Sequence, residues 1–248
     1  MLNFGLIGKG YISKNHINTI QKLGHKIVAI YDPFLSHIRN VEDIFNYNLD
    51  YVVICSPTNF HYEYIKLCLK NNVKVICEKP IGLPWNPLID NDNINIVLQY
   101  EYANLPNKAD LVEVIMVRDK KYFESWKGNS YLTGGIFYHL FIHYIMIAIK
   151  TNAIFKGKII SEGKQERKVD DIDLMKLNFE DLYLLMYQDI LSGGGIKPKD
   201  IQFLMWILDY CNFRYGMGKE VIGKIIYFDP KNVEWNIEKG KIWNFEVK

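Results

Sequence analysis

Cysteine is scarce in this chain. The 248 residues include four cysteines, and none of them belongs to a C-x-x-C pair. Cys55 and Cys77 fall inside apolar segments typical of buried strands, which argues against a framework of disulfides. The sequence therefore favours reduced thiols and a cytoplasmic protein, and it predicts no metal site.

Long apolar runs and blocks of like charge are also missing. The longest apolar run, residues 136–149, contains two histidines and is shorter than the ~20 residues that a membrane-spanning helix needs. The formal net charge is +2, and the 30 basic residues are scattered. The first residues lead directly into an apolar strand, so we expect no signal peptide. These absences predict neither a membrane span nor a nucleic-acid partner.

The first hundred residues alternate short apolar strands with helices. Strands are predicted at residues 2–8, 26–31, 50–55, 73–77 and 94–99, and helices at 11–23, 41–45 and 60–71. Repeated strand–helix–strand units build a parallel sheet with right-handed crossovers. We therefore predict an α/β fold in which residues 1–100 form a Rossmann-like, dinucleotide-binding domain.

Residues 101–248 are predicted to form a smaller α+β domain for substrate binding and oligomerisation. Its expected strands are 111–118 and 154–161, and its expected helices are 136–149, 181–191 and 198–210. The tail alternates Val233, Trp235 and Ile237, then Ile242 and Phe245, around Lys239-Gly240, a pattern that indicates a hairpin. The charge run 164–168 is interpreted as a solvated turn.

A glycine turn follows the first strand. Gly8-Lys9-Gly10-Tyr11-Ile12-Ser13 fits G-x-G-x-x-small. Gly8 permits a tight turn, and Gly10 leaves room for a pyrophosphate beside the helix N-terminus. The pattern alone is weak, but its strand–turn–helix setting favours dinucleotide binding over a plain structural turn.

An acid ends the second predicted strand. Asp32 stands about where a carboxylate would bond the adenosine ribose, which favours NAD over NADP. Asp32-Pro33 is equally well interpreted as a simple turn.

Three segments together resemble the Gfo/Idh/MocA family of NAD(P)-dependent oxidoreductases. They are GLIGKGYISKNH (5–16), DYVVICSPTNFHYE (50–63) and KVICEKPIGL (74–83). More narrowly, residues 94–100, 122–144 and 179–195 resemble the branch that oxidises the 3-hydroxyl of UDP-N-acetylglucosamine or its uronic acid. The resemblance implies an NAD-dependent sugar-nucleotide dehydrogenase of surface-glycan biosynthesis, assembled as a dimer or tetramer.

The resemblance also implies roles for single residues. Lys79 would lie beside the nicotinamide and hold the reacting hydroxyl, and His143 would be the general base, a task that suits imidazole. The bond before Pro80 is often cis in this family. The cofactor-binding residues are assigned as Gly8, Gly10, Tyr11, Ile12, Asp32, Ser56, Pro57, Thr58, His61, Glu78 and Lys79. The substrate contacts are assigned as Trp126, Lys127, His139 and Tyr183.

Several positions depart from the family's pattern. His139 replaces its Asn or Asp, Phe141 replaces a glycine, and Met146 replaces an acid; the helix expected after Lys79-Pro80 is nearly absent. Two alternatives therefore stay open: a catalytically inactive dinucleotide-binding sensor or subunit, and an oxidoreductase of another sugar or cyclitol. His139 and His143 also have the spacing of two metal ligands on a helix, but no third ligand can be named. Both histidines could instead be core residues.

Overall fold

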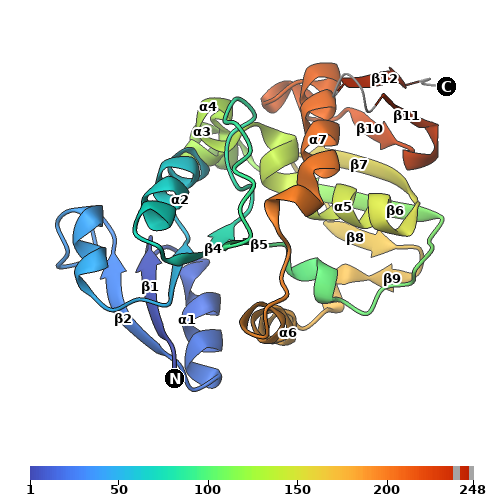
Figure 1. The fold of residues 1–248 in the computed structure, drawn as a ribbon. Helices are drawn as coiled ribbons and strands as arrows, with labels where there is room; N and C mark the ends of the chain where they lie inside the picture. The colour runs from blue at the N-terminus through green and yellow to red at the C-terminus, as the bar shows by residue number, and fades with distance from the viewer. Residues whose placement is uncertain (237–240, 246–248) are drawn as a thin grey trace. The chain divides into compact units, whose positions relative to one another are not determined.

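The computed structural model describes residues 1–236 and 241–245, with side chains up to residue 231 (Figure 1). The chain divides into two compact units, each with its own sheet. Unit 1 consists of Met1–Tyr102 and Asn178–Gln202, and unit 2 consists of Ala103–Leu177 and the chain from Phe203 onward. Unit 1 thus includes a segment that lies far beyond the domain boundary predicted at residue 100. That assignment of functional domains stays a prediction.

Unit 1 contains a parallel sheet of five strands in the order β2-β1-β3-β4-β5. The strands are β1 (Asn3–Ile7), β2 (Lys26–Tyr31), β3 (Tyr51–Ile54), β4 (Lys74–Glu78) and β5 (Ile94–Val97). The predicted α/β fold is confirmed. The strand order reverses between β1 and β3, and ligands of open parallel sheets bind beyond the carboxyl ends of the strands at such a point.

Helices cover both faces of this sheet. The regular helices of unit 1 are α1 (Ser13–Lys22), α2 (His61–Lys70) and α6 (Phe179–Leu191). Short 3₁₀ turns occur at η1 (Val41–Asn46), η2 (Thr58–Phe60), η3 (Gln99–Tyr102) and η7 (Pro198–Ile201). No helix lies between β4 and β5, so the near absence predicted after Lys79-Pro80 is confirmed.

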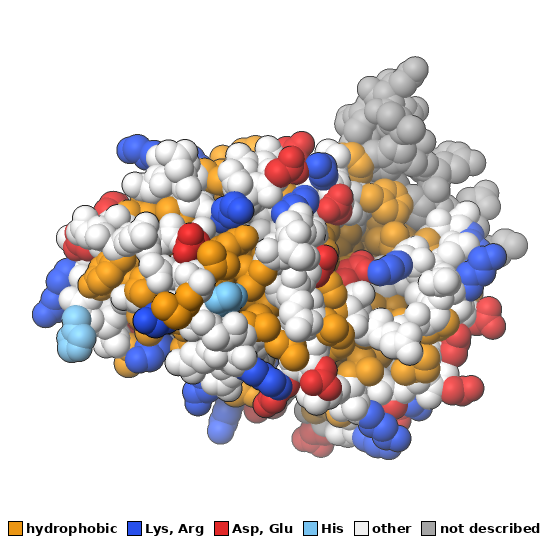
Figure 2. All heavy atoms as spheres, turned by 60° about the horizontal axis from the view of Figure 1, so that its bottom comes forward, with side chains coloured by type: hydrophobic (Ala, Val, Ile, Leu, Met, Phe, Trp, Pro, Cys, Tyr) orange, Lys and Arg blue, Asp and Glu red, His pale blue; other side chains and the backbone are white. Residues whose placement is uncertain are grey.

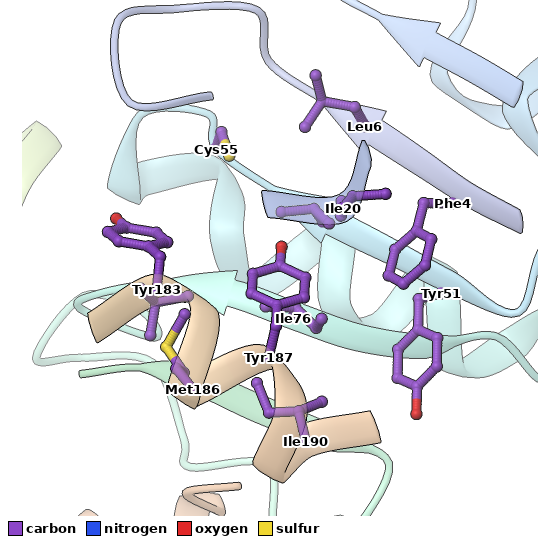
Figure 3. Packing of buried hydrophobic residues seen from close by; sticks show 12 residues of the cluster. Phe4, Leu6, Ile20, Tyr51, Cys55, Ile76, Tyr183, Met186, Tyr187 and Ile190 are labelled. Carbon is purple, nitrogen blue, oxygen red and sulfur yellow. The ribbon is translucent and has the colours of Figure 1, made fainter. Parts of the chain in front are cut away.

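One apolar core joins the sheet to α1 and α6. Figure 3 shows side chains of α6 pointing toward side chains of the strands. The members of this cluster are Phe4, Leu6, Ile20, Tyr51, Val53, Cys55, Ile76, Val97, Tyr183, Met186, Tyr187 and Ile190. Burying one large apolar side chain stabilises a fold by about 1.5–3 kcal/mol. Helix α6 is therefore an integral part of unit 1.

The segment after α6 also covers an edge of the sheet. The backbone N–H of Ile96 in β5 donates to the carbonyl oxygen of Ile196 at 2.9 Å. An unpaired edge strand is a template for unwanted strand pairing. The return of the chain thus protects β5.

Unit 2 contains a mixed sheet in the order β10-β7-β6-β8-β9. Its strands are β6 (Leu111–Val117), β7 (Ile154–Ile160), β8 (Glu166–Val169), β9 (Ile172–Asp173) and β10 (Ile225–Phe228). The solvated turn predicted at residues 164–168 is wrong where β8 begins. Only Val169 of β8 is fully buried, and the Nζ of Lys168 lies 3.4 Å from Oε2 of Glu166. Charged side chains of this partly exposed strand gave the sequence no apolar alternation, so the strand was interpreted as a turn.

The helical parts of unit 2 are mostly short. They are α3 (Lys120–Glu124), η4 (Trp126–Gly128), α4 (Ser130–Thr133), η5 (Phe137–Phe141), α5 (Ile142–Thr151), η6 (Leu174–Lys176), α7 (Gln202–Tyr215), η8 (Lys219–Val221) and η9 (Pro230–Asn232). η5 is a π-helical turn, so the helix predicted over 136–149 is not one regular α-helix. π-Helical turns are frequent at functional sites.

The predicted hairpin of the tail is confirmed, because β11 (Val233–Asn236) pairs antiparallel with β12 (Lys241–Phe245). Ile237 and the turn predicted at Lys239-Gly240 lie outside the described residues. Within the described parts of the chain, no helix combines the length and apolarity that a bilayer crossing requires. On the face drawn in Figure 2, basic and acidic side chains are interspersed.

Candidate cofactor and catalytic site

The glycine turn connects β1 to α1 at the point where the strand order reverses. Gly8 has φ +93°, and a Cβ there would lie 2.8 Å from the backbone of Cys55 and Ser56. A Cβ on Gly10 would meet no atom within 4 Å. Gly8 therefore packs against the end of β3, whereas Gly10 leaves the approach to the helix open. This arrangement fits a pyrophosphate, because backbone N–H groups at a helix start favour negative charge.

Backbone and carboxylate contacts hold the turn to the end of β2. The N–H of Gly8 donates to the carbonyl oxygen of Tyr31 at 2.8 Å, and the N–H of Lys9 donates to Oδ2 of Asp32 at 2.8 Å. Oδ1 of Asp32 accepts from the N–H groups of Phe34 and Leu35 at 2.9 and 3.0 Å. Partial burial alone would raise the pKa of Asp32, but these three N–H donors and the charge of Lys9 lower it. Asp32 thus shapes the turn, and its contact with a ribose stays a prediction.

The loop after β3 contains Ser56, Pro57 and Thr58 and leads into α2 at His61. The His61 ring is buried between two carbonyl groups: Nδ1 lies 2.7 Å from the oxygen of Pro80, and Nε2 lies 2.8 Å from that of Ser56. Burial lowers the pKa of His61, although both carbonyl groups and Glu78 oppose this. His61 therefore connects the loop after β3 to the residue that follows Lys79.

Glu78, Lys79 and Pro80 follow one another at the end of β4, and the Lys79–Pro80 peptide bond is cis, as the resemblance implies. Oε1 of Glu78 lies 3.0 Å from Nε2 of His16 and accepts from the hydroxyl of Tyr183 at 3.0 Å. Burial alone would raise the pKa of Glu78, but interactions with His16, and then with Lys79 and Tyr183, lower it. Because β1, β3 and β4 are parallel, their carboxyl ends lie at one edge of the sheet.

Two buried residues near this edge escaped the sequence analysis as site candidates. Neither His16 nor Tyr187 is given a role in the site there. Nδ1 of His16 lies 2.7 Å from the hydroxyl of Tyr187. A histidine on the inner face of a short helix was the available signal, since a buried imidazole requires hydrogen-bond partners.

The assigned residues of unit 2 fall into two environments. Trp126 is 41% exposed, and its ring lies edge-on to that of His139 at 5.8 Å. Lys127 is exposed, whereas His143 is buried in α5. The structure therefore brings Trp126 and His139 together. Tyr183 belongs to unit 1, where it is buried beside Glu78, and the substrate roles of all these residues stay predictions.

The described residues contain no group of three or more His, Cys, Asp or Glu side chains that could hold a metal ion. His139 lies in the π-helical turn and His143 in α5, so their spacing does not correspond to one regular α-helical turn. No third ligand joins them within the described parts of the chain.

Comparison with known proteins identifies the first part of unit 1. The family model "Oxidoreductase family, NAD-binding Rossmann fold" (Gfo/Idh/MocA) matches residues 2–91. The uncharacterized oxidoreductase YrbE of Bacillus subtilis is 33% identical over 93 residues, which are 32% of this chain and 27% of YrbE. The similarity therefore spans about a quarter of that curated relative.

Two solved structures share the fold of most of the chain. The WlbA (WbpB) dehydrogenase from Thermus thermophilus, in complex with NAD and UDP-GlcNAcA, has a TM-score of 0.69 and 18% identity, covering 84% of this chain and 94% of that one. Myo-inositol 2-dehydrogenase from Lactobacillus plantarum has a TM-score of 0.68 and 16% identity, covering 91% and 98%. At such identities the likeness establishes the fold.

Proposed function

Because this chain belongs to the Gfo/Idh/MocA family of oxidoreductases with an NAD-binding Rossmann fold, we propose that it is an NAD-dependent dehydrogenase. The observation that carries the proposal is the position of Lys79. It follows β4 at the same sheet edge at which the turn of Gly8 and Gly10 opens α1. A cation at that edge is suited to hold a hydroxyl beside a dinucleotide.

The residues of this chain would align the substrate and take up its proton. The bound dinucleotide would supply the hydride acceptor. Lys79 would donate a hydrogen bond to the reacting hydroxyl and stabilise the negative charge that develops on its oxygen. His143, in its neutral form, would accept the hydroxyl proton, while the hydrogen on carbon leaves with its electron pair and a carbonyl group forms.

We further propose a UDP-linked N-acetylhexosamine or its uronic acid, oxidised at the 3-hydroxyl, as the substrate. The pairing of Trp126 with His139 supports this choice, because an aromatic face beside a polar ring suits a sugar. The fold shared with a dehydrogenase bound to UDP-GlcNAcA adds support. The similar TM-score of a myo-inositol dehydrogenase makes a cyclitol the second candidate.

Turnover assays test both candidates. The protein is incubated with NAD and with UDP-N-acetylglucosamine, its uronic acid or myo-inositol, and NADH absorbance and a mass loss of two hydrogens are measured. We expect turnover of a UDP-sugar, with competition by UDP. Turnover of inositol alone, unaffected by UDP, would favour the second candidate. Tight NAD binding without any turnover would favour a non-catalytic sensor or subunit.

Matched variants test the mechanism. Lys79→Ala should abolish turnover, whereas Lys74→Ala, at the other end of β4, should retain it. His143→Ala should lower kcat by roughly 100-fold, whereas replacement of the exposed His37 by alanine should leave kcat unchanged. Retained activity in Lys79→Ala would contradict the mechanism.

We also propose a homodimer or homotetramer that acts in the cytoplasm in surface-glycan biosynthesis. The resemblance to the UDP-sugar dehydrogenase branch, which implies a dimer or tetramer, supports this assembly. Light scattering of the full chain should give twice or four times the monomer mass of 29.1 kDa. A monomeric mass would refute the assembly.

A further inference from the structure

Four side chains of unit 1 form a buried carboxylate cluster: His16 of α1, Glu78 of β4, and Tyr183 and Tyr187 of α6. Their exposed fractions are 0, 7, 1 and 0%. Three hydrogen bonds of 2.7 to 3.0 Å connect them in a chain from Tyr187 through His16 to Glu78 and Tyr183. Glu78 is the residue immediately before Lys79.

The chemistry of the groups gives each bond a direction. An ionised carboxylate only accepts, so Nε2 of His16 and the Tyr183 hydroxyl must both donate to Glu78. Burial raises the pKa of Tyr183 and of Tyr187, so both hydroxyls keep their protons. In a neutral ring, Nδ1 of His16 then accepts from Tyr187. Glu78 thus selects the ring tautomer in which Nε2 carries the hydrogen, and Tyr187 holds the other ring nitrogen.

The residue after Lys79 has an anchor of the same kind. The carbonyl group of Pro80 lies 2.7 Å from Nδ1 of His61, the first residue of α2. The residues on both sides of Lys79 are therefore attached to buried histidines. One histidine lies on the helix that the glycine turn opens, and the other lies on the helix that follows the loop of β3.

We propose that His16 is a positioning residue for Lys79. It holds the side chain of Glu78 and so fixes the end of β4 relative to α1, while Tyr187 holds the His16 ring through Nδ1. This inference rests on the proposed function where it concerns catalysis by Lys79. It also gives Glu78 a part that needs no contact with the dinucleotide.

If the cluster served packing alone, burying the carboxylate of Glu78 would lower the stability of the fold without a return in function. Removing an ionised carboxylate from water carries a large penalty, and apolar residues of similar volume often stabilise a fold as well or better. A positioning role requires the donor at Nε2 instead. Replacements that keep or lose that donor therefore distinguish the two explanations.

Kinetics of three variants make the first test. Tyr187→Phe should lower kcat roughly tenfold and leave the dissociation constant of NADH within about twofold, because Tyr187 acts on Lys79 through His16 and Glu78. Tyr51→Phe, from the same apolar core, is the control and should change neither. His16→Gln, whose amide can donate to Glu78, should retain a higher kcat than His16→Phe. A higher kcat in His16→Phe would overturn the proposal.

The second test needs no turnover. Nitrogen NMR of the histidine rings should show hydrogen on Nε2 of His16 in the free protein. Reductive ¹³C-methylation gives each lysine a resonance, and that of Lys79 is assigned by its loss in Lys79→Arg. It should shift in Glu78→Gln and Tyr187→Phe but not in Tyr51→Phe. If Nε2 lacks hydrogen, or if the Lys79 resonance is the same in all variants, the positioning role is refuted.

The outcomes separate this inference from the proposed function. If the wild-type protein turns over no substrate, the dehydrogenase proposal fails, while the His16 and Lys79 resonances still decide whether the cluster positions the lysine. If turnover is found but either the His16 or the Lys79 resonance contradicts the cluster, the positioning role alone fails.

Discussion

At the scale of single residues, Gly8 and Gly10 of the same turn are subject to different constraints. Gly8 is confined by the protein, since its φ is positive and the end of β3 lies against it. Gly10 is confined by nothing in the protein, because the space beside its Cα is open. The fold therefore gives no reason for a glycine at position 10, whereas a pyrophosphate close to the helix start would give one.

Alanine substitutions separate the two constraints. Gly8→Ala should destabilise unit 1 by about 1–3 kcal/mol or more, because the left-handed backbone and the clash with Cys55 and Ser56 both carry a penalty. Gly10→Ala should leave the melting temperature unchanged and weaken NAD binding roughly tenfold or more. Thermal unfolding and NADH fluorescence titration measure the two effects. A Gly10→Ala variant with full NAD affinity would refute the location of the pyrophosphate.

Asp32 predicts an acid-dependent contribution to stability. Its pKa is lowered in the folded chain, so the unfolded chain binds its proton more readily. The contribution is therefore complete above the unfolded pKa of about 3.9 and is lost as the pH falls through the folded pKa. Asp32→Asn deprives Lys9 N–H of its acceptor and should be less stable by about 0.5–1 kcal/mol at pH 7. In urea titrations the difference should be constant well above a pH of about 3.9 and should shrink as the pH falls below that value; a difference that does not change with pH would contradict the assignment.

At the scale of elements, α6 shows what local pattern can and cannot reveal. Its amphipathic spacing predicted a helix over 181–191, and the structure places one at Phe179–Leu191. Nothing in that spacing indicates that Tyr183 and Tyr187 pack on the sheet of unit 1. Their partners His16 and Glu78 lie 171 and 105 residues away, and one sequence does not specify contacts of that separation.

Neighbouring residues of α6 give a matched test of its packing. Met186 is fully buried in the core cluster, whereas Leu185 is 47% exposed. Met186→Ala should destabilise unit 1 by about 2–5 kcal/mol, and Leu185→Ala should change its stability by about 0.5 kcal/mol or less. Native-state hydrogen exchange of amides in β1 and β3 reports the unfolding of this unit. Equal effects of the two substitutions would contradict the docking of α6 described above.

The strands of the two sheets differ in how readily they are predicted. In unit 1, β1, β3, β4 and β5 are buried almost throughout, so each is a short apolar run followed by a turn. β8 of unit 2 reads Glu166-Arg167-Lys168-Val169, and its charged residues alternate with little apolar signal. β9 was missed because it has only two residues, Ile172 and Asp173. β10 reads Ile225-Ile226-Tyr227-Phe228, so its apolar signal was present and was overlooked.

At the scale of the whole molecule, the features that could be predicted are those whose parts adjoin in the sequence. The glycine turn, the Lys79-Pro80 segment and the alternation of strands and helices each lie within a short stretch. The buried carboxylate cluster and the division into units depend on the return of residues 178–202. The family resemblance therefore identified the residues at the carboxyl edge of the unit 1 sheet, but it did not identify the buried carboxylate cluster that packs beneath them.

This return of the chain has a consequence for synthesis on the ribosome. Translation proceeds at about 5–20 residues per second, so β1 to β5 emerge several seconds before α6 can reach them. During that interval the face formed by Phe4, Val53 and Ile76 lacks the part of its cover that α6 supplies. Unit 2 meanwhile acquires most of its own strands. The apolar face of the unit 1 sheet is thus open to aggregation until α6 has been synthesised and has packed against it.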